Sequence, residues 1–139
     1  MIYEVYGPPS SGKSTRVIKE LSKDKICLYV NADFQLMDNL IGTDTYIVNT
    51  NKMPIIKTVV EQLSNTVDVI VIDSLPMLTN EEENINKVIT DMQKIISICN
   101  RNGVDLYIVN QYRNNQYSEE YTYYLNRLKI YYHKRIKVG

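Results

Sequence analysis

The chain has 139 residues, enough for one domain of ordinary size and too few for two, so we treat residues 1–139 as a single domain. Hydrophobic residues make up 44% and charged residues 23%, which excludes a disordered chain. No apolar run approaches the roughly 18 residues of a membrane helix, and the N-terminus does not read as a signal sequence. We therefore expect a cytoplasmic protein with no membrane partner.

Sixteen basic and sixteen acidic residues cancel overall, but their distribution is uneven. The last 39 residues carry a net charge of +4, which leaves the first 100 residues at −4. A basic, tyrosine-rich tail is typical of a nucleic-acid face, and a solvated charged edge is an equally good explanation. Cys27 and Cys99 lie in apolar stretches without metal-ligand spacing, so we expect buried free thiols.

Strand and helix patterns alternate along the chain. Strands are predicted over residues 2–6, 26–30, 46–48, 67–72 and 106–109, and helices over 13–21, 55–63 and 84–99. We expect residues 110–120 to form a loop and residues 125–138 to end in a strand or hairpin. This alternation predicts an α/β fold with a mostly parallel central sheet flanked by helices, which binds ligands at the carboxyl edge of its strands.

A phosphate-binding motif follows the first predicted strand. Residues 7–15 satisfy GxxxxGK[ST] between a strand and a helix, where a P-loop must lie. Glycines let backbone N–H groups approach a phosphate, Lys13 supplies a positive charge, and Ser14 offers a hydroxyl to Mg²⁺. We therefore predict ATP as the ligand, held by the whole loop: Gly7, Pro8, Pro9, Ser10, Ser11, Gly12, Lys13, Ser14 and Thr15.

A carboxylate is expected to complete the metal site, because Mg²⁺ prefers oxygen ligands. Asp73 directly follows the β-branched run of residues 67–72, so it is the candidate Walker B residue, with Ser74 expected to orient it. The alternative is an aspartate that only caps a turn. Because kinases, GTPases, helicases and transporters share these motifs, the motifs do not choose a reaction.

Four segments resemble the RecA recombinase family. Residues 7–15 resemble its phosphate loop, with Pro after the first Gly and two Ser before the second; residues 67–75 (VDVIVIDSL) are similar to its Walker B strand. Residues 106–113 (LYIVNQYR) resemble its later strand that ends in Asn-Gln, and residues 126–131 (NRLKIY) resemble the segment after its DNA-binding loop. The resemblance implies a RecA-like ATPase core, in a minimal form of phage or plasmid type.

Site roles follow from that resemblance. Asp33 matches the family's catalytic glutamate. Because an aspartate is one methylene shorter than a glutamate, we expect slow hydrolysis. Gln111 matches the glutamine that senses the γ-phosphate. Lys129, with Arg127 as the nearby alternative, matches a cation that reaches a neighbouring subunit's nucleotide, which implies self-association into a ring or filament. Each of these residues could instead be an ordinary turn, loop or surface residue.

The resemblance also implies a partner, single-stranded DNA, bound through Tyr112, Arg113 and Tyr117 by base stacking and phosphate pairing. Recombination, annealing or repair is then the expected role. Two alternatives remain open: a nucleotide-gated DNA-binding module with little hydrolysis, and a motor subunit of a hexameric helicase or DNA-packaging ATPase. The family's N-terminal oligomerisation segment does not precede the first strand, so we expect filament formation and strand exchange to be weakened.

Overall fold

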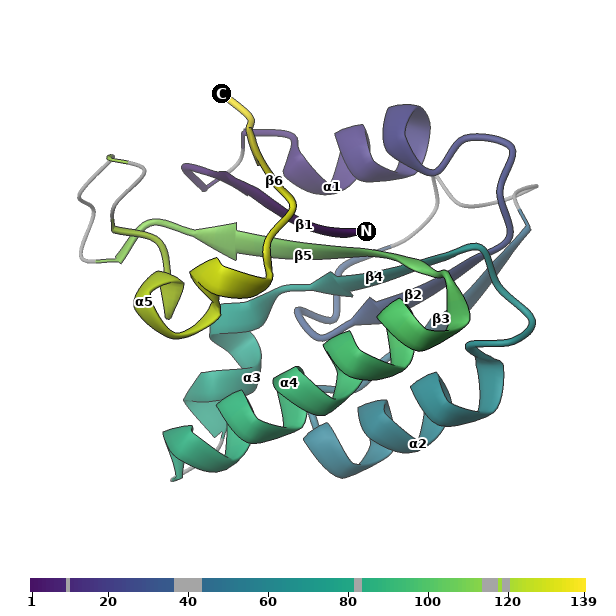
Figure 1. Ribbon diagram of the computed structural model, residues 1–139. Helices are drawn as coiled ribbons and strands as arrows, with labels where there is room; N and C mark the ends of the chain where they lie inside the picture. The colour runs from purple at the N-terminus through teal and green to yellow at the C-terminus, as the bar shows by residue number, and fades with distance from the viewer. Residues whose placement is uncertain (10, 37–43, 82–83, 114–117, 119–120) are drawn as a thin grey trace.

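The computed structural model describes residues 1–9, 11–36, 44–81, 84–113, 118 and 121–139. Within them a six-stranded sheet has the order β3-β2-β4-β5-β1-β6, and every paired strand is parallel to its neighbour (Figure 1). The strands are β1 (Ile2–Gly7), β2 (Cys27–Asn31), β3 (Thr45–Val48), β4 (Val69–Asp73), β5 (Asp105–Gln111) and β6 (Lys134–Lys137).

Helices cover both faces of this sheet (Figure 1). One face carries α1 (Lys13–Arg16), which continues as a π-helical turn over Val17–Leu21. The opposite face carries α2 (Met53–Leu63), α3 (Leu75–Glu81) and α4 (Ile85–Asn102). A short helix, α5 (Leu125–Leu128), and a 3-10 turn over Lys129–Tyr131 then lead the chain into β6. This is the layered arrangement that a parallel sheet requires, because both of its faces must be buried.

Alternation along the strands divides the core into two layers. In β4, Ile70 and Ile72 face α2, α3 and α4, whereas Val69 and Val71 face α1. All four side chains are fully buried. Successive side chains of a strand point to opposite faces, so the β-branched run of residues 67–72 fills both layers at once. Asp73 continues the α1 side of this pattern, and the site is therefore built on the face that α1 covers.

Residues 125–138 end in a strand, as predicted: α5 and a 3-10 turn come first, and β6 then pairs parallel to β1. Asn110 and Gln111 were predicted in a loop, yet they extend β5 and pair with Tyr6 and Gly7. The side-chain amide of Asn110 donates hydrogen bonds to the Glu4 carboxylate and to the Tyr123 carbonyl oxygen, so this polar residue can remain in the sheet.

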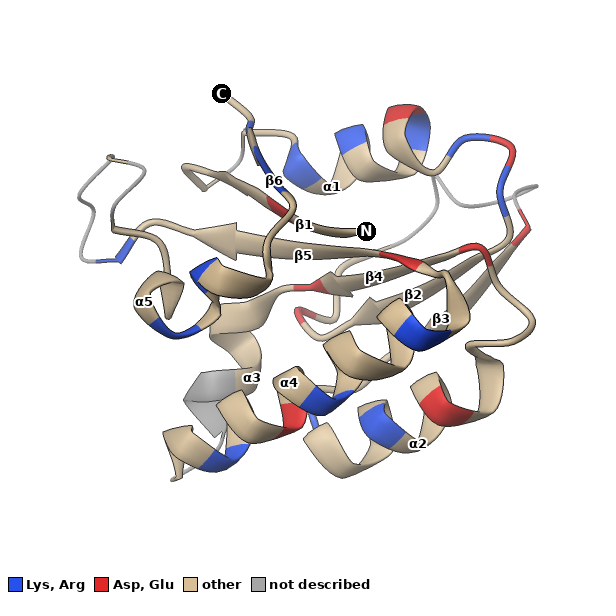
Figure 2. Cartoon of the chain, viewed as in Figure 1, with Lys and Arg blue, Asp and Glu red and all other residues tan. Residues whose placement is uncertain are grey.

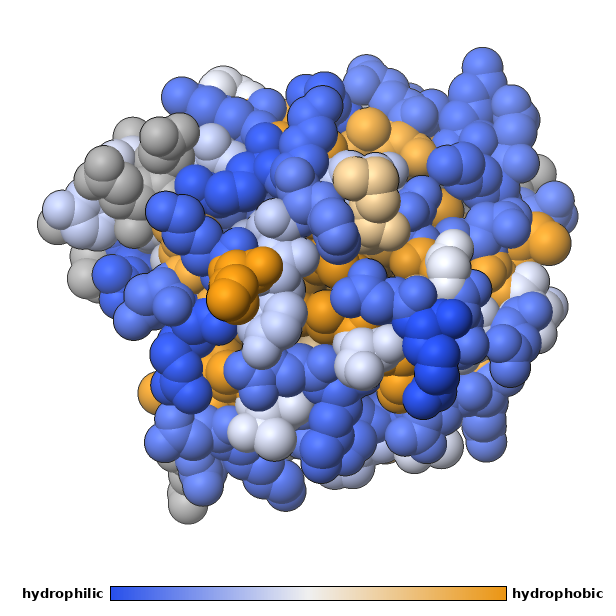
Figure 3. All heavy atoms as spheres, in the orientation of Figure 1, coloured by the Kyte–Doolittle hydropathy of each residue, from blue (hydrophilic) through white to orange (hydrophobic). Residues whose placement is uncertain are grey.

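The surface carries the basic residues of the tail along α5 and β6 (Figure 2). The face seen in Figure 3 is mainly hydrophilic, with separate small apolar spots. Among the helices of the described residues, none combines the length and the apolar character needed to cross a membrane.

Candidate nucleotide-binding site

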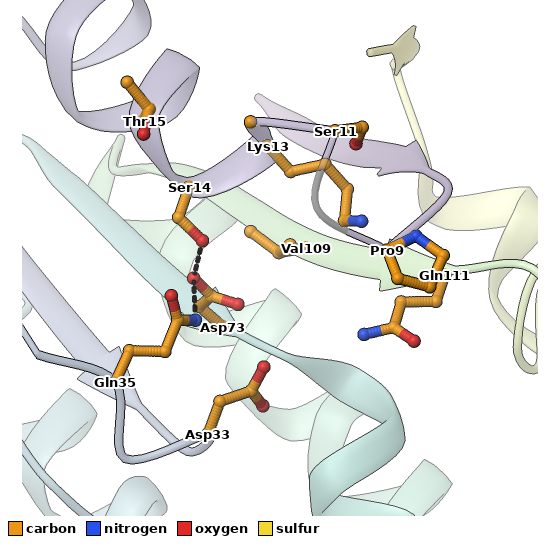
Figure 4. Close-up of a pocket in the computed structure, with 11 residues that line it drawn as sticks. Pro9, Ser11, Lys13, Ser14, Thr15, Asp33, Gln35, Asp73, Val109 and Gln111 are labelled. Carbon is orange, nitrogen blue, oxygen red and sulfur yellow. Dashed lines mark hydrogen bonds between the residues drawn. The ribbon is translucent and has the colours of Figure 1, made fainter. Parts of the chain in front are cut away.

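Three strands bring their carboxyl ends together at one edge of the sheet. The register places Gly7 at the end of β1 beside Gln111 of β5, and Asp73 at the end of β4 beside Val109 of β5. A cavity of about 440 Å³ opens over these ends (Figure 4), large enough for a small-molecule ligand. Its lining residues are Pro9, Ser11, Gly12, Lys13, Ser14, Thr15, Asp33, Gln35, Asp73, Val109 and Gln111.

The two glycines of the motif are required for different reasons. Gly12 precedes α1 with φ 85°, a left-handed conformation that strains any residue with a Cβ. At Gly7 the conformation is ordinary, but an added Cβ would lie 2.0 Å from the Val138 carbonyl oxygen and 2.9 Å from Ser11 Oγ. Gly7 thus lets the segment after β6 pack against the loop, which is a constraint beyond the approach to phosphate expected from the motif.

Lys13 is almost buried at the start of α1, and its side chain is hydrogen-bonded to the main chain of the loop. Its Nζ donates hydrogen bonds to the carbonyl oxygens of Gly7 (3.1 Å) and Pro8 (2.8 Å). Burial lowers the pKa of Lys13, and the nearby carboxylates of Asp73 and Asp33 partly oppose that shift. The ammonium is held by neutral carbonyl groups, so it can exchange these bonds for the oxygens of an anion that enters the cavity.

Asp73 is the buried carboxylate of the site, with only 1% of its surface exposed. One oxygen, Oδ2, accepts hydrogen bonds from the hydroxyls of Ser14 and Tyr29 and from Gln35 Nε2 (3.2 Å). Burial raises the pKa of Asp73, and the hydrogen bonds from Ser14 and Tyr29 oppose that shift. Among the described residues, no cation forms an ion pair with Asp73.

This donor set fits Mg²⁺. A hard divalent cation takes oxygen ligands, and it usually keeps several waters and phosphate oxygens beside one or two protein groups. Ser14 and Asp73 are already in contact: Ser14 offers a hydroxyl, and Asp73 offers a carboxylate that forms no ion pair within the described part of the chain. The two residues predicted to hold the metal are therefore adjacent and chemically suited to do so.

Asp33 lies beside Asp73 at the mouth of the cavity (Figure 4). The main-chain N–H groups of Ala32 (2.7 Å) and Asp33 (3.2 Å) both donate to the Asp73 carbonyl oxygen, which ties the turn after β2 to the end of β4. Asp33 Oδ1 accepts hydrogen bonds from the N–H (3.0 Å) and the hydroxyl (2.8 Å) of Ser74. Ser74 was expected to orient Asp73; its side chain orients Asp33 instead, because the chain turns away after β4.

Of the remaining predicted site residues, some line the cavity and others lie away from it. Gln111 lines the cavity. Lys129 and Arg127 are exposed and do not line it, and Arg127 donates to Asn86 on α4 (3.0 Å). Arg113 is exposed, but Tyr112 is buried edge-on against Tyr6, so its ring is not available to stack on a base as predicted. Two further predicted residues, Ser10 and Tyr117, lie outside the described residues.

Two residues of the site were missed by sequence reasoning. Tyr29 and Gln35 come from β2 and the turn after it, and both donate to the Asp73 carboxylate. Burial raises the pKa of Tyr29, so its hydroxyl keeps its proton and remains a donor. A single hydroxyl inside the otherwise apolar run of residues 26–30 was the available signal, since a buried tyrosine hydroxyl usually has a hydrogen-bond partner.

Together, the parallel sheet, its strand order and the loop between β1 and α1 define the RecA-like class of P-loop fold, as predicted. Neither the protein-family models nor the curated protein sequences gave a match. Among solved structures, the chain is similar to the RadB recombinase, with a TM-score of 0.70 and 14% identity over 98% of this chain and 73% of that one. It is also similar to a KaiC-like protein from the hyperthermophilic archaeon Pyrococcus horikoshii, with a TM-score of 0.63 and 15% identity over 86% of this chain and 65% of that one. At these low identities, the structural similarity shows a shared fold.

Proposed function

We propose that this protein binds ATP with Mg²⁺, hydrolyses it slowly, and acts on single-stranded DNA in recombination, annealing or repair. One observation carries the nucleotide part of the proposal. Asp73 is a buried carboxylate without a cationic partner among the described residues, and it contacts Ser14 at the floor of a cavity that also contains Lys13. This is the constellation that a magnesium–triphosphate complex would complete.

Each residue of the loop has a role in binding. The N–H groups at the start of α1 would face the phosphates, and Lys13 would transfer its hydrogen bonds from Gly7 and Pro8 to phosphate oxygens. Ser14 and Asp73 would hold Mg²⁺. When bound, the metal would neutralise the negative charge that gathers on the β- and γ-phosphate oxygens.

Asp33 is the candidate group for hydrolysis. Its carboxylate borders the same cavity and is fixed by two hydrogen bonds from Ser74. In this position it can accept a hydrogen bond from an attacking water and orient it toward the γ-phosphate. Both bonds end on Oδ1, so Oδ2 is the oxygen that would face the water. Gln111, from the opposite wall, would contact the γ-phosphate with its neutral amide.

A neighbouring copy would supply a further cation. Lys129 and Arg127 are exposed and outside the cavity of their own chain, which suits a role in trans on a ring or filament neighbour. A positive charge provided in this way stabilises the transition state and makes hydrolysis depend on assembly. The basic residues of β6 and α5, together with Arg113, support DNA as the partner through phosphate contacts.

The test is ATP turnover with Mg²⁺, measured with and without single-stranded DNA at low salt. The proposal expects DNA to stimulate turnover, and Asp33→Ala to lose turnover while retaining nucleotide affinity. Equal rates with and without DNA, combined with no DNA binding at low salt, would refute the DNA part. Absence of Mg²⁺-dependent nucleotide binding would refute the whole proposal.

A nucleotide-gated DNA-binding module is the second candidate function. It is favoured by the position of Asp33, which is one methylene shorter than a glutamate and is already engaged by Ser74. In that case ATP binding alone would alter DNA affinity, and Asp33→Ala would leave both binding reactions and the negligible turnover unchanged.

A further inference from the structure

A second buried carboxylate lies outside the cavity, in the middle of β1. Glu4 has 0% of its surface exposed. Its Oε1 accepts from Arg135 Nε on β6 (2.6 Å), and its Oε2 accepts from Asn110 Nδ2 at the end of β5 (2.9 Å) and from Thr122 Oγ1 (3.0 Å). One side chain therefore joins three segments that are far apart in the sequence.

Stability alone does not explain this arrangement. Removing a carboxylate and a guanidinium from water is unfavourable, and apolar residues of similar volume often stabilise a fold equally well. Here the geometry is specific: Arg135 also donates to Thr122 Oγ1 (3.3 Å), and its guanidinium lies 4.6 Å from the centre of the Tyr6 ring. Such a network holds its members in a single arrangement, which suggests a role in positioning.

The residue next to this network is Gln111, the candidate sensor of the γ-phosphate. The Gln111 N–H donates to Asn110 Oδ1 (2.9 Å), so the same amide that bonds to Glu4 also holds the Gln111 main chain. On the other side, the N–H of Tyr123 donates to the Gln111 carbonyl oxygen (3.2 Å), and Asn110 Nδ2 donates to the Tyr123 carbonyl oxygen (2.9 Å).

The network also holds the two described ends of the segment that follows β5. Tyr112 and Thr122 pair in an antiparallel bridge, and Thr122 bonds directly to Glu4. A shift of Gln111 toward or away from a phosphate would therefore disturb Asn110, and through Glu4 it would disturb Thr122 and Arg135.

We infer that Glu4 is a positioning residue: through Asn110 it holds Gln111 at the distance from which its amide distinguishes ATP from ADP, and through Thr122 it holds the bridge to Tyr112. This inference rests on the proposed nucleotide binding. Glu4 does not line the cavity, so its substitution removes no side chain that would itself contact phosphate or metal.

The experiment measures the dissociation constants of ATP and ADP, each with Mg²⁺, for four proteins: wild type, Glu4→Gln, Gln111→Ala and the double variant. Glu4→Gln is expected to weaken ATP binding about threefold to tenfold, the range for one hydrogen bond, and to leave ADP binding unchanged. The double variant is expected to match Gln111→Ala alone, because both changes remove the same contact.

Asp91→Asn is the matched control. Asp91 is another buried carboxylate in an ion pair, with Lys57 at 3.3 Å, and it lies on α4 and does not line the cavity. The Asp91→Asn substitution should change neither the affinity for ATP nor the affinity for ADP. Should Glu4→Gln fail to fold, Thr122→Val removes one hydroxyl from the same network and is expected to change the ATP-to-ADP affinity ratio in the same direction, by a smaller factor.

Several outcomes would overturn the inference. The first is that Glu4→Gln weakens the binding of ATP and of ADP equally. The second is that the effects of Glu4→Gln and Gln111→Ala add in the double variant. The third is that Gln111→Ala keeps the wild-type ratio of ATP affinity to ADP affinity. A wild-type protein that binds neither nucleotide would instead refute the proposed function, so the two failures are distinguishable.

Discussion

Asp73 and Glu4 are both buried carboxylates in the same sheet, and each accepts hydrogen bonds from three side chains. They differ in the charge of those donors. Glu4 is paired with the guanidinium of Arg135, whereas the donors to Asp73 among the described residues are two hydroxyls and an amide. Neutral donors satisfy the lone pairs of a carboxylate without cancelling its charge. Asp73 thus retains an attraction for a cation, whereas the charge of Glu4 is already balanced.

The largest expected effect comes from removing the cation of the nucleotide cavity. Lys13→Ala should weaken Mg²⁺–ATP binding by about 100-fold, near the upper end of the range for a hydrogen bond to a charged group. Lys19→Ala, an exposed lysine of the same helical segment, is the control and should bind ATP like the wild type. Titration with a fluorescent ATP analogue measures both. Similar affinities for the two variants would mean that this cavity is not the phosphate site.

The two carboxylates should respond in opposite ways to loss of charge. Glu4→Gln removes the buried carboxylate that pairs with the Arg135 guanidinium, so the free energy of unfolding should fall by about 3 kcal/mol. Asp73→Asn removes an unbalanced buried charge and keeps an oxygen acceptor for the hydroxyls. Its free energy of unfolding should therefore be unchanged or higher by about 1 kcal/mol in the absence of Mg²⁺.

Urea unfolding of both variants and the wild type, with EDTA present, measures this contrast. Added Mg²⁺ and ATP should stabilise the wild type and leave Asp73→Asn nearly unaffected, because a ligand stabilises only the protein that binds it. Destabilisation of similar size in both variants without metal would show that the charge of Asp73 is balanced after all.

The pH dependence of stability should separate Asp73 from its asparagine variant. Because burial raises the folded pKa of Asp73 above its ordinary value of 3.8, the folded protein keeps this proton at pH values where the unfolded chain has lost it. The carboxyl therefore destabilises the fold increasingly as pH rises through that window, and fully above the folded pKa. Without Mg²⁺, the stability of Asp73→Asn relative to the wild type should grow as pH rises from 3.8 toward neutrality. A constant difference would contradict the raised pKa.

The smallest expected effect concerns the hydroxyl that holds Asp73 from β2. Tyr29→Phe removes one donor from Oδ2, so the Mg²⁺ concentration needed for half-maximal ATP binding should rise about fivefold, the worth of one hydrogen bond. Tyr107→Phe is the control: Tyr107 packs in the same α1-side core, and its hydroxyl bonds only weakly, to the Leu21 carbonyl at 3.5 Å. An equal change in both variants would indicate general loosening of that core.

Local patterns in the sequence were sufficient for the strands, for α1, α2 and α4, and for the centre of the site, but not for α3 and α5. The motif of residues 7–15 and the β-branched run before Asp73 predicted a P-loop and a metal-binding carboxylate, and the structure brings Ser14 and Asp73 into contact. The placement of these residues could be predicted because the information lies within a few consecutive residues; metal binding itself stays a prediction. Alternation of strands and helices likewise predicted a parallel sheet, since a crossover helix is what a parallel pair requires.

Only the tertiary structure decided which side chains surround those groups. Tyr29 reaches Asp73 across 44 positions of sequence, and Arg135 reaches Glu4 across 131. Strand order and register produce such contacts, and neither can be predicted from a local sequence pattern. The same reason explains the corrections: Ser74 turns to Asp33, and Tyr112 is buried against Tyr6, because neighbouring strands and turns supply partners that a single stretch of sequence does not reveal.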